Sequence, residues 1–258
     1  MGFPKLEDIF IGSLNNLIMI WHNQFIPHSF CKLQNLVVHN CENLKKVFPN
    51  NMLRILQNLE KLEILDCALV EEVFEISGVN VEETIHMVAS ILRDLKLFNL
   101  PNLKHVWDSA MFTFQNLREL DIDGCLSLKS IFPISVAKSL AQLEKLRIKD
   151  CRVEEIVAIE EGSEITTDFV LPRITSLILQ SLPELKYFCP RKHTSKWPSL
   201  RRLEIYRCPK VKIVSLDDLS CHDTSGLGHH HVPIQPLLFL IEKVRARTTF
   251  VSMHIYDT

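Results

Sequence analysis

The segment Leu59-Glu-Lys-Leu-Glu-Ile-Leu-Asp-Cys67 returns 84 residues later as Leu143-Glu-Lys-Leu-Arg-Ile-Lys-Asp-Cys151. Both have the form L-x-x-L-x-φ-x-x-C, where φ is apolar, and this nine-residue frame is numbered 1–9 below. Three more copies end in cysteine and begin at residues 33, 117 and 200. Three others end in leucine and begin at residues 6, 92 and 174.

The spacing of these copies identifies the fold. Successive copies start 25–33 residues apart, and five of the seven steps lie within the roughly 20–29 residues typical of leucine-rich repeats. We interpret the two longer steps, which end at residues 92 and 174, as repeats that carry loop insertions. Because equivalent copies recur after 82–86 residues, the array is interpreted as a duplicated block of three repeats.

Each frame predicts one short strand. Positions 4 and 6 are apolar and two residues apart, so they point to the same face of a strand. Stacked repeats then bury a continuous core that no single repeat could bury. The Cys or Leu at position 9 should turn inward, where a thiol packs as a small hydrophobe.

These features predict an α/β fold, a leucine-rich-repeat solenoid. A curved parallel sheet should form its concave face, and short helices with irregular loops its convex face. Helical turns are expected at Asn51–Leu56 and Ile134–Leu140, where apolar residues recur at helical spacing.

The array is predicted to span residues 1–214 with about eight repeats. Residues 215–258 contain no complete frame and should form an irregular tail, a flexible loop followed by a partial cap or a truncated repeat. The first frame starts at Leu6, which leaves no room for an N-terminal cap. Because solenoids need covered ends, we expect the chain to be a piece of something larger.

Composition and motifs argue against several classes of function. A formal net charge of −2 disfavours nucleic acid as the main partner. No run approaches the ~20 apolar residues of a membrane span, and no signal peptide or N-glycosylation acceptor occurs. These features predict a cytoplasmic protein.

Catalytic and cofactor motifs are also absent from the sequence. There is no P-loop, Gly-x-Ser-x-Gly, His-Glu-x-x-His or EF-hand loop, and five of the eight cysteines occupy frame position 9 rather than zinc-ligand spacing. The histidines at 229–231 are interpreted as part of a polar loop. The paired carboxylates Glu71-Glu72 and Glu154-Glu155 are interpreted as solvated convex-side charges. We therefore expect no enzyme activity, no cofactor and no metal.

The exposed side chains of the concave face should lie at frame positions 3, 5 and 7. In register, this predicts five neighbouring pairs of opposite charge: Lys61 with Asp94, Glu63 with Lys96, Glu119 with Lys145, Asp121 with Arg147, and Asp123 with Lys149. Such pairs can simply neutralise one another along the sheet. Alternatively, Asp121, Asp123, Arg147 and Lys149 can form a dipolar recognition surface, and both roles can hold together.

Large apolar side chains are predicted in the same columns. They are Phe10, Val37, Leu65, Phe98, Ile178 and Tyr206. Apolar residues on a concave sheet are candidates for the anchors of a protein interface, although isolated apolar residues are common on surfaces. Phe98 and Tyr206 are the first choices because aromatic residues dominate many interfaces.

The block Phe114–Pro133 and the segments Leu140–Cys151 and Val153–Val157 resemble repeats of plant intracellular immune receptors. The family is the coiled-coil class of nucleotide-binding leucine-rich-repeat (NBS-LRR) disease-resistance proteins, and the resemblance covers residues 1–214. It implies a role in defence, with a pathogen effector or a guarded host protein as partner. It also implies restraint of a nucleotide-binding module, which these 258 residues do not contain. The alternative is a standalone adaptor or substrate-receptor scaffold.

Overall fold

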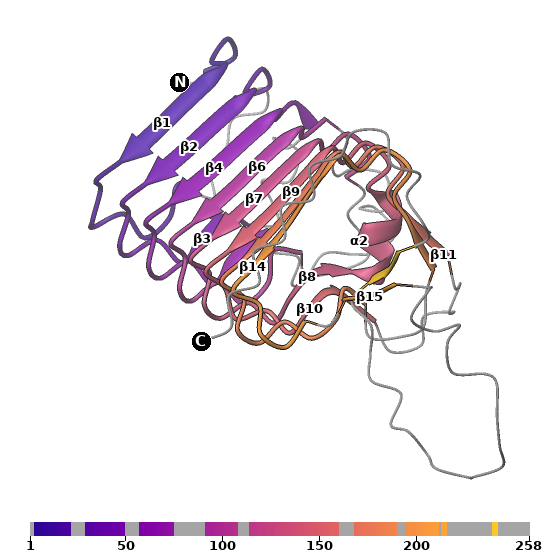
Figure 1. The fold of residues 1–258 in the computed structure, drawn as a ribbon. Coiled ribbons are helices and arrows are strands. Elements are labelled where there is room, and N and C mark those ends of the chain that lie inside the picture. The colour runs from indigo at the N-terminus through magenta and orange to yellow at the C-terminus, as the bar shows by residue number, and fades with distance from the viewer. Residues whose placement is uncertain are drawn as a thin grey trace, which may run out of the picture.

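The computed structural model describes residues 3–21, 29–49, 57–74, 91–107, 114–159, 168–189, 194–211, 213–215 and 239–241. Its main feature is a parallel sheet that runs along a solenoid (Figure 1). Within these residues the sheet has eight strands, β1, β2, β4, β6, β7, β9, β12 and β14, arranged in the same order as in the chain. Their bounds are Asp8–Gly12, Asn35–His39, Lys61–Leu65, Asp94–Phe98, Glu119–Asp123, Lys145–Lys149, Ser176–Gln180 and Arg202–Tyr206. Each strand occupies positions 3–7 of one frame, which confirms the predicted solenoid.

The burial of the frame positions follows the prediction. In the inner strands, position 4 and position 6 are buried while positions 3, 5 and 7 remain accessible, as in β2 and β12. The position-9 cysteines of the four inner copies, Cys41, Cys67, Cys125 and Cys151, are at most 1% exposed. Their thiols donate to nearby carbonyl oxygens, as Cys151 does to Lys149 O at 3.0 Å. The cysteines are therefore core residues of the solenoid.

At the β1 end one expectation fails. Leu14 occupies frame position 9 and should turn inward, but it is 51% exposed. The equivalent Leu100 and Leu182 are fully buried because a repeat stacks on either side of them. Among the described strands β1 has only β2 as a neighbour, so Leu14 is covered from one side only.

The opposite side of the solenoid is more regular than the sequence suggested. Short parallel strands pair there between successive repeats: β3 (Lys46–Phe48) with β5 (Glu72–Phe74), and β8 (Ser130–Pro133) with β10 (Glu155–Ala158). Two further pairs are β11 (Asp168–Val170) with β13 (Thr194–Lys196), and β15 (Ile213–Ser215) with β16 (Phe239–Ile241). Each pair lies side by side in register, so the two backbones can hydrogen-bond laterally, and β13, with the sequence Thr-Ser-Lys, shows that the paired segments need not be apolar. The expectation of irregular loops was wrong for these segments.

Helix α2 (Ile134–Ser139) confirms the helical turn expected at 134–140. The other turn, expected at 51–56, lies outside the described residues. Most of the predicted tail also lies outside them, so the division at residue 214 stays a prediction.

A row of aromatic rings runs through the interior, with one ring contributed by each of five successive repeats. Its members, all 15 residues after the start of a frame, are Trp21, Phe48, Phe74, Trp107 and Phe132. Neighbouring centroids are 5.9, 5.7, 6.0 and 6.1 Å apart, and each pair is stacked. This aromatic row links the repeats by contacts between nearest neighbours, the source of stability in solenoids.

Frame position 8 carries a backbone conformation that the sequence analysis missed. It has φ between 48° and 68° in all eight copies: Ser13, Asn40, Asp66, Asn99, Gly124, Asp150, Ser181 and Arg207. This left-handed turn redirects the chain from the sheet to position 9. The signal was present, because five of the eight residues are Asn, Asp or Gly, the types that adopt this conformation most easily.

Candidate protein-interaction surface

The solvent-facing side chains at frame positions 3, 5 and 7 of the main sheet are called the strand face below. All strands pair in the same register, so equivalent positions of neighbouring repeats lie side by side. The five predicted pairs of opposite charge are all register partners. The sequence frame alone was therefore sufficient to predict which strand-face residues are neighbours.

Four of these five pairs also form ion pairs. Lys96 Nζ lies 2.8 Å from Glu63 Oε1, Arg147 Nη1 lies 2.7 Å from Asp121 Oδ1, and Lys149 Nζ lies 3.3 Å from Asp123 Oδ2. Lys145 contacts Glu119 in the same way. Lys61 instead pairs with Glu63 of its own strand at 3.1 Å.

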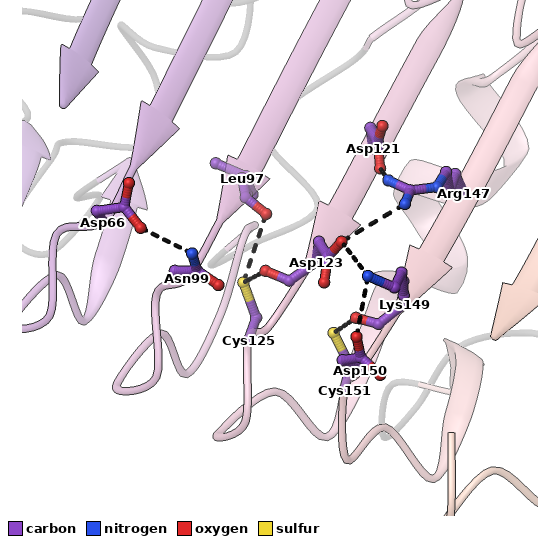
Figure 2. Close-up of polar contacts among 10 residues, drawn as sticks. All are labelled: Asp66, Leu97, Asn99, Asp121, Asp123, Cys125, Arg147, Lys149, Asp150 and Cys151. Carbon is purple, nitrogen blue, oxygen red and sulfur yellow. Dashed lines mark hydrogen bonds and ion pairs between the residues drawn. The ribbon is translucent and has the colours of Figure 1, made fainter. Parts of the chain in front are cut away.

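Strands β7 and β9 carry the densest part of this network (Figure 2). Arg147 reaches both Asp121 and, at 3.5 Å, Asp123. Lys149 lies between Asp123 and Asp150, at 3.3 and 3.1 Å. Because each charge already has an opposite partner, the network presents little net charge to solvent. Because these pairs remain accessible to solvent, each contributes little to stability.

Glu63 and Asp94 differ in how the fold affects their ionisation. Burial opposes ionisation of Glu63, but hydrogen bonds from Lys96 and Lys61 outweigh it, so the pKa of Glu63 is lowered. The pKa of Asp94 is raised, first by burial and then by the neighbouring Glu119 carboxylate. Ionised Glu63 is thus favoured by the fold, and ionised Asp94 is not.

This difference predicts opposite pH effects of two neutralising substitutions. A lowered folded-state pKa adds stability above the unfolded value of about 4.3 and loses it as pH falls through the folded pKa. We therefore expect Glu63→Gln to cost about 1 kcal/mol or less at pH 7, and nothing at low pH, because Lys96 remains partly exposed.

For Asp94→Asn the expected pH dependence of stability is the opposite. A raised pKa favours the protonated form, so wild-type stability is lost as pH rises through the folded pKa. The substitution should be neutral or stabilising at pH 7. Urea unfolding of both variants between pH 3 and pH 7 checks the pair, and parallel pH dependences would contradict it.

The predicted apolar anchors all lie on the strand face but differ in exposure. Phe10 is 71% exposed, whereas Val37, Leu65, Phe98, Ile178 and Tyr206 are half-buried. Side chains on strands about 4.8 Å apart cover one another on the inner strands. Tyr206 lies on the edge strand β14, where Arg207 covers its ring. The sequence pattern overestimated the exposure of those five residues.

These apolar residues form separate groups on the strand face. Phe10 is the register partner of Val37, and Leu65 that of Phe98. The charges of β7 and β9 separate them from Ile178 of β12 and Tyr206 of β14. Arg207 also stacks over the Tyr206 ring, with its guanidinium carbon 5.0 Å from the centroid.

The paired carboxylates are partly accounted for by ion pairs. Glu71 binds Lys104 at 2.6 Å, and Glu154 binds Lys186 at 2.9 Å. Glu155 is half-buried rather than fully solvated, and burial, followed by Glu154, raises its pKa. In the part of the chain that the structure describes, no three His, Cys, Asp or Glu side chains gather where they could hold a metal ion.

The described helices were also compared with the requirements of a membrane span. None has the length and apolar character needed to cross a bilayer. The strand face, with its ion pairs and half-buried apolar groups, is thus the feature of the described residues that most resembles a protein-binding surface.

Comparison with known proteins identifies the family. A family model described as plant disease resistance protein RPS2-like, leucine-rich repeats, matches residues 5–152. The chain belongs to this family. The resemblance to plant disease-resistance repeats is thereby confirmed.

Two relatives of this RPS2-like repeat chain come from Arabidopsis thaliana. A probable disease resistance protein is 29% identical over 130 residues, which cover 50% of this chain and 14% of the relative. A putative disease resistance protein is 32% identical over 123 residues, covering 47% of this chain and 9% of the relative. The RPS2-like chain thus matches only a small part of these relatives. No solved structure matches it.

Proposed function

We propose that this chain is the recognition part of a plant intracellular immune receptor that acts in the cytoplasm. Its strand face binds a pathogen effector or a modified host protein. The family of residues 5–152 and the names of the relatives support a defence role. The observation that carries the binding role is the accessible Leu65–Phe98 pair beside a self-neutralised charge network.

This arrangement suits an apolar anchor of a protein partner. Leu65 and Phe98 are register neighbours and still partly exposed, so a partner side chain can remove their remaining apolar surface from water. Glu63 and Lys96 lie beside them and already bind each other at 2.8 Å. Docking there would keep Glu63 and Lys96 paired with each other, which lowers the cost of burying them.

The second part of the proposal is restraint of a nucleotide-binding module located elsewhere in the receptor. The relatives are much longer than the segments that this chain matches, which leaves room for further modules. Binding of the sensed protein would compete with this restraint. The chain itself contributes binding and no catalytic step.

Phe98→Asp is expected to abolish strand-face binding while the chain stays folded. A carboxylate there would sit next to Leu65 and near Asp123, so loss of a central aromatic anchor should weaken binding by at least about 30-fold, that is by 2 kcal/mol or more. Proximity biotinylation in plant cells, with the biotin ligase fused to the chain, measures this. It identifies the proteins that are labelled beside the wild-type chain and no longer labelled beside the variant.

Leu126→Asp is the matched control, because Leu126 is 48% exposed and lies in the turn after β7, off the strand face. Proteins lost with Phe98→Asp and kept with Leu126→Asp support the proposal. Identical labelled sets for both variants would contradict it. Ubiquitin-ligase subunits in the lost set, without a nucleotide-binding module, would favour the adaptor role instead.

A further inference from the structure

The turns that follow the strands of the main sheet stack along one edge of the solenoid (Figure 1). The residue directly after each frame, at position 10, lies on this edge. In five successive repeats these residues, called the edge row below, are Glu42, Ala68, Pro101, Leu126 and Arg152. Leu126 is 48% exposed, Ala68 is exposed as well, and Pro101 is partly exposed. The edge row thus has an apolar centre three repeats long and a charge at each end.

The backbone of this apolar centre already has hydrogen-bond partners. Leu69, 37% exposed, lies next to Ala68 and widens the apolar surface. Asn102 Nδ2 donates to the carbonyl oxygen of Ala68 at 2.9 Å, and Ser127 Oγ donates to that of Pro101 at 2.6 Å. A partner that covers the centre therefore leaves neither carbonyl without a hydrogen bond, which avoids a cost of burial.

The two end charges of the edge row are opposite in sign and unpaired. Glu42 and Arg152 are both exposed. Neither forms an ion pair or a side-chain hydrogen bond with any residue that the structure describes. Strand-face charges such as Glu63 and Arg147, by contrast, have opposite partners within the chain. The partners of Glu42 and Arg152 must therefore come from another molecule.

The edge row is complementary to itself when it is reversed. Turning it end for end about Pro101 places Glu42 opposite Arg152 and Ala68 opposite Leu126. Equivalent residues of neighbouring repeats lie about 4.8 Å apart, so the row is about 19 Å long and matches the spacing of its reversed copy. A surface that matches itself after a half-turn is what a two-fold dimer requires.

We propose that two copies of the chain dimerise through their edge rows, which run antiparallel about a two-fold axis at Pro101. Glu42 of each copy pairs with Arg152 of the other, and Leu126 packs on Ala68. The axis lies in the contact plane and runs from the strand face to the opposite side of the solenoid, so both strand faces point the same way. Dimerisation goes beyond the proposed function, because no residue of the edge row belongs to the strand face.

The contact is small, so we expect a weak dimer. A row of five residues buries less surface than the roughly 1,200 Å² of stable protein interfaces. Lys104 of one copy also comes near Lys104 of the other, but Glu71 binds it at 2.6 Å within each copy and limits the repulsion. The charges at the two ends therefore fix the antiparallel orientation more than they add affinity.

Sedimentation equilibrium of the full chain tests the dimer. We expect the weight-average mass to rise from one copy toward two between about 5 and 500 µM, as mass action requires of a reversible association. A reductant should be present, since the exposed Cys31 would otherwise cross-link copies. High salt should weaken the association, because it screens the exposed end charges.

Charge-reversed variants provide the specific test. Glu42→Arg alone and Arg152→Glu alone each place like charges opposite one another at both ends of the contact, so each should raise the dissociation constant at least about tenfold. A variant with both substitutions exchanges the charges and should dimerise like the wild type. An equimolar mixture of the two single variants should also form dimers. Far-ultraviolet circular dichroism checks that each variant folds.

Leu126→Asp tests the apolar centre in the same way. It should raise the dissociation constant at least about tenfold, because a carboxylate replaces the largest apolar side chain of the contact. Phe10→Asp is the control, since Phe10 is 71% exposed but lies on the strand face. It should leave dimerisation unchanged.

Several results would overturn the dimer. One is a wild-type chain that stays a single copy up to the highest concentration, and another is a single charge variant that associates like the wild type. A double variant that does not regain association places the contact elsewhere, and a mass that climbs beyond two copies excludes a closed dimer. None of these results bears on strand-face binding, which Phe98→Asp tests separately.

Discussion

Phe74→Ala is expected to lower the free energy of unfolding by about 3–5 kcal/mol, the range for deleting a fully buried aromatic ring. Phe74 is 1% exposed and lies in the middle of the aromatic row. Its centroid is 5.7 Å from that of Phe48 and 6.0 Å from those of Trp107 and Phe114. The substitution thus removes contacts to the repeats on both sides at once.

Urea unfolding followed by circular dichroism measures this loss. Phe10→Ala is the matched control, because it removes the same ring from a position that is 71% exposed. It should change the free energy of unfolding by about 0.5 kcal/mol or less. Equal effects of the two substitutions would show that the aromatic row does not couple the repeats.

Gly124→Val is expected to destabilise the chain by about 1–3 kcal/mol, the cost of holding an unsuited residue in a sparsely populated backbone region. Gly124 has φ +68°, which β-branched residues avoid. A Cβ there would also lie 2.6 Å from Asn99 Oδ1. Asn99 cannot move freely, because its Nδ2 donates to Asp66 Oδ1 at 2.7 Å (Figure 2).

Two further variants separate these causes, again by urea unfolding. Gly124→Asn should cost less than Gly124→Val, since asparagine tolerates the left-handed conformation that it already has at Asn40 and Asn99. Gly124→Val should cost less when it is introduced into an Asn99→Ala chain than into the wild type, because the Asn99 side chain that it meets is then absent. If Gly124→Val unfolds like the wild type, the left-handed turn is not required at this position.

Much of the fold could be predicted because the repeat imposes it. Once the frame at Leu59 or Leu143 is recognised, stacking in register follows from the need to bury positions 4 and 6. The neighbours on the strand face then follow by counting, and all five predicted charge pairs became register partners. The frame could not predict which of these neighbours form ion pairs. Long side chains choose among several partners, as Lys61 does in binding Glu63 rather than Asp94.

The sequence by itself determined the period, the parallel sheet, the inward cysteines and the residues of the strand face, because these depend only on local spacing and polarity. Tertiary structure alone decided how much of each side chain stays exposed. Phe10 is exposed and Phe98 half-covered although both occupy outward positions, because coverage depends on the neighbours that each strand has. The short strands opposite the main sheet have the same origin: their hydrogen bonds join different repeats, so no single repeat encodes them.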